Sequence, residues 1–430
     1  MVIDMRILIK NVNVFDGRKP ELAEKQKIVI EDNLVTDILS GDVSEENFDR
    51  VIDGNGLYAI PGLTDAHVHL GKTHIDGATA RYDTVVGSVV AGKLLQHGIT
   101  TVRDAGSMVD GIKQAVDEGI IPGPRIYPSM NYLSQTCGHG DNDAAHANRD
   151  IQYRAPMGVA LCDGIAEVQR AVREQFYLGA SQIKIMAGGG MSSVCDPVAT
   201  MQFSLEEMKA ITEAADDYGS YVLAHLYTPN CMKRAIKAGV KSLEHGHWLD
   251  EETANMIVDR NVFLNPCPQF TLEEVKWNHM GEWSDQPSQM RKKNKRGGNP
   301  VKEHIAETTE LIHKYDIKIL FGTDLMIMYN EYEPRESLDF TEYKKRFGSY
   351  KGLLAATGNF HELTKLTTYQ NPYPDGKIGV LEKGSYADLL ILNANPVEDL
   401  DVLGDTENIL LVMKDGKIFK NTLEADKRKE

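Results

Sequence analysis

The chain has little of what marks secreted, membrane-embedded or nucleic-acid-binding proteins. Its 430 residues contain five cysteines and no CxxC pair, which argues against a disulfide framework and a thiolate zinc site. No run reaches the roughly 18 apolar residues that a transmembrane helix needs. The formal net charge of −16 favours small molecules or dipeptides as partners over nucleic acid or an anionic membrane.

The N-terminus also lacks a recognisable targeting signal. Residues 1–17 alternate apolar and polar side chains as a strand does. They contain neither the long apolar core nor the small-residue cleavage site of a signal peptide. We therefore expect a cytoplasmic protein.

Both ends of the chain are rich in short β patterns. Residues 1–60 and 367–430 contain apolar runs separated by Asp-Gly and Gly-Asn turns, and residues 414–417 (KDGK) are a strong type I′ hairpin signal. Because both segments are too short to fold well alone, we predict that they pair into one small β-sandwich domain.

The middle of the chain, residues 61–366, predicts an α/β domain, a (β/α)8 TIM-type barrel. Short apolar runs alternate there with helical periods, one of which opens with a capping box from Ser204 to Glu207. Eight such alternations favour a barrel over an open sheet. The runs are AIPGLTDAHVHL, ITTVRDAG, RIYPSM, QIKIMAGG, YVLAHLYT, SLEHGHWL, VFLNPCP and IKILFGTD. Four helices end at a glycine that suits a left-handed cap, namely Gly98, Gly179, Gly219 and Gly239.

Two connections interrupt this alternation. Residues 131–162 and 269–300 are long, polar and aperiodic, and each follows the end of a predicted strand. Active sites of TIM-type barrels form at that end, so we expect these loops, together with residues 196–202, to determine specificity.

The first predicted barrel strand ends in His67 and His69. Alternation along a strand puts both imidazoles on one side, about 6–7 Å apart at the backbone, which is close enough for one metal ion. Four other strands also end in potential ligands, and such polar residues are rare within apolar strands. They are Lys184, His225, His245 and Asp324.

Lys184 is the unusual member of this set. An ammonium group is a poor neighbour for metal ions and histidines, and burying it without compensation is costly. If its amine reacts with carbon dioxide, the lysine becomes a carbamate, an anionic ligand with two oxygens that can bridge two metal ions.

The motifs HVH, IKIMAGGG, AHLY, EHG and GTD, in this order, resemble those of the amidohydrolase superfamily. Within it the chain is most similar to the binuclear zinc dipeptidase (prolidase-like) and imidazolonepropionase-like branch, which includes ochratoxin-hydrolysing enzymes. The resemblance covers nearly the whole chain and implies two divalent metal ions, expected to be zinc, although the ligands also suit manganese or cobalt. It also implies a homo-oligomer.

The resemblance further implies a role for each matching residue. His67 and His69 would hold the more buried ion, His225 and His245 the more exposed one, and carboxylated Lys184 would bridge both. Asp324 would ligate the buried ion and shuttle the proton. His139 and Tyr227 match positions that contact the substrate's carbonyl oxygen or terminal carboxylate.

The resulting prediction is an amide hydrolase that acts on dipeptides or N-acyl amino acids. A divalent ion lowers the pKa of bound water to about 7, so a hydroxide between the two ions is available to attack the carbonyl. The exact substrate is left open.

The sequence favours three other interpretations less. A mononuclear deaminase or cyclic-amide hydrolase would not use a lysine ligand, and deaminases typically carry glutamate where this chain has Thr228. A non-enzymatic scaffold would lack ligands that this chain retains. The run Gly188-Gly189-Gly190 lacks the Gly-Lys-Ser/Thr of a phosphate-binding loop, so we interpret it as a backbone turn beside the site.

Overall fold

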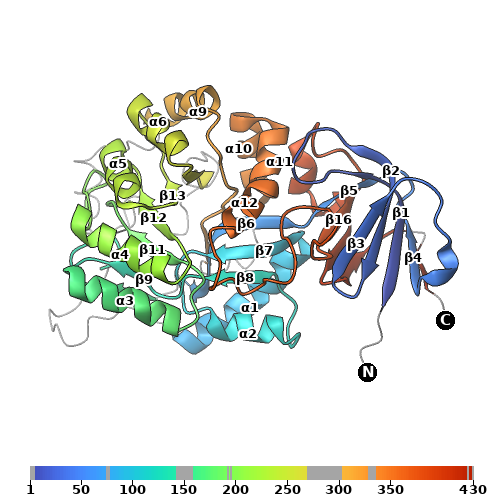
Figure 1. Ribbon diagram of the computed structural model, residues 1–430, viewed down its shortest axis with the longest axis horizontal. Coiled ribbons are helices and arrows are strands. Elements are labelled where there is room, and N and C mark those ends of the chain that lie inside the picture. The colour runs from blue at the N-terminus through green and yellow to red at the C-terminus, as the bar shows by residue number, and fades with distance from the viewer. Residues whose placement is uncertain are drawn as a thin grey trace.

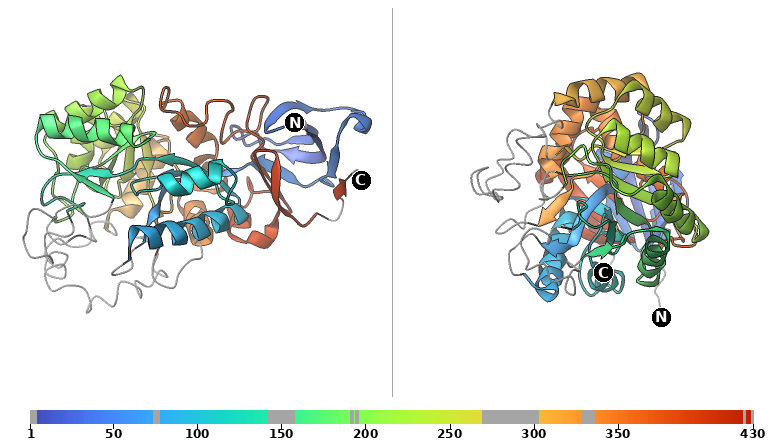
Figure 2. Two further views of the ribbon diagram at one scale, coloured as in Figure 1. Left: turned by 90° about the horizontal axis from the view of Figure 1, so that it is seen from below. Right: turned by 90° about the vertical axis from the view of Figure 1, so that its left-hand side faces the viewer.

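The computed structural model describes residues 5–73, 78–141, 158–190, 193, 196–268, 303–327, 336–423 and 426–428. Strands from the two ends of the chain form one body, and strands and helices from its middle form a larger one beside it (Figure 1). Both termini lie at the strand-rich end of the molecule (Figures 1 and 2). None of the helices in these ranges has the length and hydropathy that crossing a bilayer requires.

Strands from both ends of the chain share one nine-stranded sheet. Its order is β18-β17-β16-β5-β1-β2-β3, with β4 beside β1 and β19 beside β4. Strand β5 joins the two ends, because it pairs with β1 in parallel and with β16 in antiparallel orientation. The strands are β1 (Arg6–Val14), β2 (Ala23–Glu31), β3 (Leu34–Leu39), β4 (Arg50–Asp53), β5 (Tyr58–Pro61), β16 (Leu389–Leu392), β17 (Ile409–Lys414), β18 (Lys417–Asn421) and β19 (Asp426–Arg428).

The middle of the chain forms two parallel sheets. Their orders are β15-β6-β7-β8 and β10-β9-β11-β12-β13-β14. The strands are β6 (Leu63–Thr73), β7 (Ile99–Asp104), β8 (Arg125–Pro128), β9 (Tyr132–Ser134), β10 (Val159–Leu161), β11 (Ile183–Met186), β12 (Val222–Leu226), β13 (Ser242–His245), β14 (Phe263–Asn265) and β15 (Leu325–Ile327).

Helices cover the outer side of these parallel strands (Figure 1). Helix α1 is typical, because Val86, Val90 and Leu94 recur at helical spacing and are buried in the core. The helices are α1 (Ala80–Gln96), α2 (Asp110–Asp117), α3 (Ile165–Tyr177), α4 (Leu205–Asp217), α5 (Pro229–Ala238), α6 (Glu251–Asp259), α9 (Ile305–Lys314), α10 (Glu336–Phe347), α11 (Ser349–Ala355) and α12 (Gly358–Thr364).

Among the described residues, only short contacts join the edges of the two parallel sheets. The backbone N–H of Ser181, just before β11, donates to the carbonyl of Pro128 in β8 at 2.7 Å. On the other side, Ile319 forms an isolated parallel bridge with Leu264 of β14. The α/β class is therefore confirmed, whereas closure into a (β/α)8 barrel stays a prediction, because continuous strand pairing runs only within each sheet.

The eighth predicted strand, IKILFGTD, is not a regular strand. The N–H of Phe321 donates to the carbonyl of Ala355 at 3.0 Å, so it is not available to a neighbouring strand. The carbonyl of Phe321 accepts from the N–H of Ala66 in β6 at 2.7 Å. A regular strand forms only later, in β15, which pairs with β6.

Several local signals of the sequence are confirmed. The capping box at the start of α4 is formed in both directions. In the β17–β18 hairpin, Asp415 and Gly416 have φ values of 53° and 69°, as a type I′ turn requires. The four glycines predicted to end helices all have positive φ. The region 131–162 is less irregular than expected, because it contains β9 and β10, and residues 269–300 lie outside the described residues.

Arg125, in β8, connects the parallel strands to the nine-stranded sheet. Its guanidinium donates to Asp388 at 3.0 Å and also to Asp415, and it lies 3.6 Å from the centroid of the Tyr386 ring. The Arg125 side chain is only 5% exposed. The contact therefore joins the two bodies through a desolvated ion pair.

We expect Arg125→Met to lower the free energy of unfolding by about 3–5 kcal/mol, because it leaves the buried carboxylate of Asp388 without its cation. Urea unfolding followed by circular dichroism measures this. Arg170→Met is the matched control, because Arg170 pairs with Glu174 on an exposed surface, and its loss is expected to change stability by less than about 1 kcal/mol. Equal effects of the two substitutions would contradict the role of Arg125.

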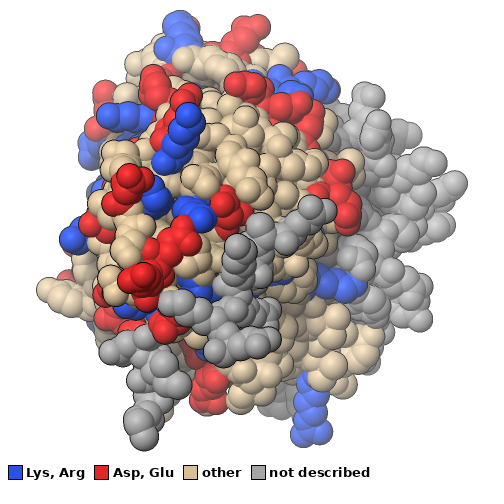
Figure 3. Space-filling view, turned by 90° about the vertical axis from the view of Figure 1, so that its right-hand side faces the viewer, with Lys and Arg blue, Asp and Glu red and all other residues tan. Residues whose placement is uncertain are grey.

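Charges of both signs are interspersed on the strand-rich end of the molecule (Figure 3). Lysine and arginine side chains lie beside aspartate and glutamate side chains in this view, and the coloured residues show no single acidic patch.

Candidate metal centre

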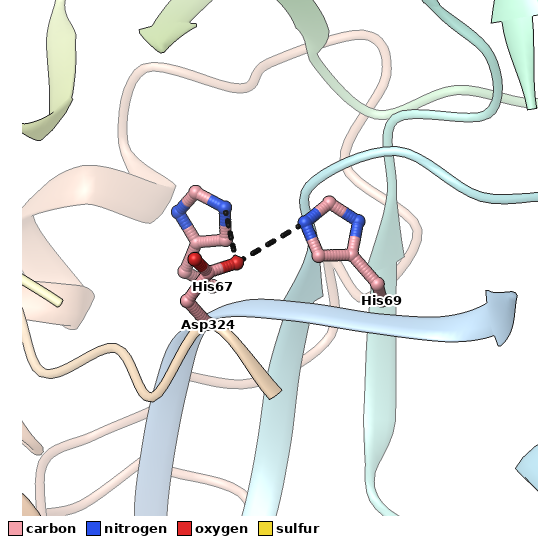
Figure 4. A group of neighbouring side chains, drawn as sticks. All are labelled: His67, His69 and Asp324. Atoms are coloured by element: carbon pink, nitrogen blue, oxygen red, sulfur yellow. Dashed lines mark ion pairs between the residues drawn. The ribbon is translucent and has the colours of Figure 1, made fainter. Parts of the chain in front are cut away.

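Two histidines from the middle of β6 and an aspartate just before β15 lie close together (Figure 4). His67 Nε2 lies 3.5 Å from Asp324 Oδ1, and His69 Nε2 lies 3.4 Å from the same oxygen. One ligand atom from each of the three residues falls within 4.8 Å of the others. Imidazole nitrogens and a carboxylate oxygen at this spacing can bind one divalent ion.

Two of the predicted ligands have an uncommon backbone conformation. Asp324 has φ of 52° and His245 has φ of 73°, in the left-handed region that non-glycine residues seldom adopt. Such conformations cost about 1–3 kcal/mol each and gather at functional sites. Here they direct both side chains towards His67.

Lys184 lies in β11 and is almost fully buried. Its Nζ is 3.3 Å from Nε2 of His67, which places an amine directly beside the histidine cluster. Burial lowers the pKa of Lys184, although Glu244 and Asp324 partly oppose the shift. A larger fraction of the side chain is therefore the neutral amine, which is the form that reacts with carbon dioxide.

The remaining predicted residues continue this cluster. The ring centroids of His67 and His245 lie 5.3 Å apart, and those of His225 and His245 lie 4.6 Å apart. Tyr227 stacks on His245 at 5.1 Å, and His139 stacks on His225 at 4.1 Å. The structure thus brings all eight predicted site residues into one continuous group.

The buried nitrogen of one histidine indicates that the group fits a metal ion. Nε2 of His225 is buried and has no hydrogen-bond partner among the described residues. Burial is the largest cause of the low pKa of His225, so the ring is neutral and its free lone pair can bind a cation. An ion bound at Nε2 would compensate a polar atom whose burial is otherwise unfavourable.

The sequence reasoning missed the groups that orient His67. Nδ1 of His67 donates to Glu244 at 2.7 Å, and the other carboxylate oxygen of Glu244 accepts from Arg103 at 2.8 Å. Arg103 and Glu244 are both fully buried. A carboxylate on the second ring nitrogen fixes the tautomer that leaves Nε2 for a metal ion.

The sequence pattern does not predict Glu244 as part of the site, because Glu244 precedes His245 in one strand and alternation predicts that the two residues face opposite sides. The left-handed backbone of His245 breaks this alternation. One feature of the sequence could have indicated this pair, because Arg103 and Glu244 carry opposite charges within two otherwise apolar strands. Two further buried groups also escaped notice: Cys267, near His67 and Glu244, and His247, which stacks on Tyr227.

The histidine cluster predicts how the stability of the metal-free protein depends on pH. Burial lowers the pKa of His245 from 6.5 to about 4, and it also lowers the pKa of His67 and His225. Between these values the unfolded chain binds more protons than the folded protein. The free energy of unfolding therefore falls as the pH decreases from about 6.5 towards about 4.

Urea unfolding in the presence of a chelator at several pH values measures this slope. In His245→Asn the slope is expected to be shallower, because one of the groups that gains a proton on unfolding is gone. An unchanged slope in this variant would contradict the prediction.

The sequence and the fold of this chain are similar to those of known proteins. A sequence model of the amidohydrolase family matches residues 58–419. The ochratoxinase of Aspergillus niger is 30% identical over 393 residues, covering 84% of this chain and 75% of that protein. A prolidase solved with N-methylphosphonate-L-proline has a TM-score of 0.85 and 30% identity, covering 97% of this chain and 100% of its own. A Xaa-Pro dipeptidase with bound methionine has a TM-score of 0.83, 30% identity and the same coverage.

Proposed function

Since the chain belongs to the amidohydrolase family, we propose that it is a binuclear metal-dependent hydrolase of amide C–N bonds. The substrates that we propose are Xaa-Pro dipeptides, related dipeptides and N-acyl amino acids. The observation that carries the proposal is the buried amine of Lys184, 3.3 Å from Nε2 of His67 and surrounded by potential metal ligands.

The fold provides the framework for this proposal. We propose that the two parallel sheets are arcs of one (β/α)8 barrel formed by residues 61–366, with the site at the C-terminal ends of its strands. Residues 1–60 and 367–430 form the accessory β domain. Their common nine-stranded sheet supports this division.

In the proposed site, His67, His69 and Asp324 would hold one divalent ion, and His225 and His245 would hold the other. Lys184, as a carbamate, would be an anionic ligand that the two ions share. When bound, such ions supply a water of lowered pKa and polarise a carbonyl oxygen, so they provide the nucleophile and the electrophilic activation of amide hydrolysis.

Asp324 is suited to hold and pass on a proton. Burial alone would raise the pKa of its carboxyl, but His67, His69 and His245 hold that pKa below its ordinary value. Asp324 is therefore ionised at neutral pH and can accept a proton, which it then returns to the departing amine. Tyr227 and His139 both pack against the ring of His225, where they can contact the carbonyl oxygen or a terminal carboxylate of the substrate.

The substrate class is inferred from the relatives. One neighbour carries a phosphonate derivative of proline and another is a Xaa-Pro dipeptidase. The curated relative is an ochratoxinase. These names support an amide whose amine portion is an amino acid.

The test is hydrolysis of a panel of Xaa-Pro dipeptides, other dipeptides and N-acyl amino acids, together with the metal content of the purified protein. We expect about two ions per chain and turnover of at least one class. One ion per chain, with deamination or cyclic-amide opening in place of peptide hydrolysis, would instead indicate the mononuclear alternative.

A further inference from the structure

His139 occupies a space that only glycine at position 190 leaves open. A Cβ atom built on Gly190 would lie 1.8 Å from Cε1 and 2.1 Å from Nδ1 of the His139 ring. No real Cβ atom approaches another heavy atom so closely. The third glycine of the 188–190 run therefore allows the imidazole to pack directly on the backbone.

A buried carboxylate holds the same ring from its edge. Asp196 Oδ2 accepts from Nδ1 of His139 at 3.2 Å, from the N–H of Gly190 at 2.9 Å and from Nε2 of Gln202 at 3.2 Å. The Asp196 side chain is fully buried. Asp196 Oδ2 thus links three residues, namely His139, Gly190 and Gln202.

The neighbouring backbone packs equally closely. A Cβ on Gly189 would lie 1.9 Å from the carbonyl oxygen of Pro197, so this glycine keeps the Asp196 segment near β11. The amide oxygen of Gln202 also accepts from the backbone N–H of His139 at 2.9 Å. Ring and backbone of His139 are therefore both fixed.

We propose that Gly190 and Asp196 are positioning residues that form a socket for His139. The socket holds the imidazole face to face with His225, at 4.1 Å and an interplanar angle of 11°. Because Nδ1 is bound to Asp196 and Ser193, Nε2 is the ring nitrogen left to contact a substrate. The effect on catalysis rests on the proposed function, whereas the fit of the ring into the socket does not.

Ser193 does not turn this group into a serine-hydrolase triad. Its Oγ lies 2.9 Å from Nδ1 of His139, the same nitrogen that contacts Asp196. A triad needs the serine and the carboxylate on opposite ring nitrogens. Ser193 therefore adds to the socket.

The fit is tested by a double-mutant cycle in thermal unfolding. Gly190→Ala is expected to lower Tm by at least about 3 °C, because the methyl group collides with the His139 ring. In a His139→Ala background the collision is absent, and the same substitution is expected to change Tm by less than about 1 °C. Gly92→Ala is the control, since a Cβ there meets its nearest neighbour at 3.6 Å. If Gly190→Ala lowered Tm equally in the wild-type and His139→Ala backgrounds, the proposed packing of His139 on Gly190 would be refuted.

The positioning role is tested by kinetics with a substrate from the panel. Gly190→Ala and Asp196→Ala are expected to lower kcat about 10- to 100-fold with little change in KM, because misplacing a reacting group by about 1 Å has this effect. Asp196→Asn, which retains an acceptor, is expected to keep most of the activity. In the His139→Ala background neither alanine substitution is expected to lower kcat further.

The outcomes separate the two proposals. Additive losses of kcat in the His139→Ala background would refute positioning through His139. If no substrate of the panel were hydrolysed, the proposed function would be refuted. The double-mutant cycle measured by thermal unfolding would still decide whether Gly190 and Asp196 form a socket for His139.

Discussion

Lys184→Ala is expected to lower kcat/KM for amide hydrolysis by about a thousandfold or more and to reduce the metal content from two ions per chain to one or none. The side chain is buried beside His67, and its carbamate would supply an oxygen to each ion. Its loss removes the anionic bridge, and metal sites supply several kcal/mol of transition-state stabilisation. Steady-state kinetics and elemental analysis of the purified variant measure both effects.

Two controls sharpen this experiment. Lys209→Ala removes an exposed lysine of α4 and is expected to leave both quantities unchanged. Added formate or acetate can place a carboxylate in the space left by the carbamate and should partly restore metal and activity to Lys184→Ala. In the wild type, bicarbonate should raise the metal content of protein reconstituted from the chelated form. A Lys184→Ala variant with two ions and full activity would refute the carbamate.

Glu244→Gln is expected to lower the free energy of unfolding of the metal-free protein by about 3–5 kcal/mol. Glu244 accepts from both Arg103 and His67, and all three side chains are almost fully buried. Without the negative charge the guanidinium of Arg103 is an uncompensated buried cation. The same change weakens the orientation of His67, so metal affinity is expected to fall about 10- to 100-fold.

Removing the cation as well provides the control. In Arg103→Met/Glu244→Gln no uncompensated charge is left, so at least half of the lost stability should return, as seen in urea unfolding. Glu206→Gln, at an exposed position of α4, controls for the loss of a carboxylate. If the double variant were as unstable as the sum of both single variants, the two charges would not be coupled.

The sequence by itself predicted most of the local elements and the eight residues that the structure brings together around His67. Helical and strand periods depend on neighbours a few residues apart, which is why the capping box of α4 and the turn at Asp415 and Gly416 were predictable. Polar residues at the ends of apolar strands likewise pointed to one place, because parallel strands end on the same side. Cytoplasmic location, homo-oligomer formation and the identity of the metal stay predictions.

Only the tertiary structure showed what holds these residues in place. Arg103 and Glu244 form an ion pair although they are 141 positions apart in the sequence. The requirement for glycine at position 190 follows only from the packing of the His139 ring against it. The backbone of Phe321, whose N–H is bound to Ala355 instead of to a strand, was equally hidden. Such contacts depend on packing between segments that are far apart in the sequence, and local periodicity does not predict this packing. The potential ligands at each strand end, in contrast, can be identified from the residues next to them in the sequence.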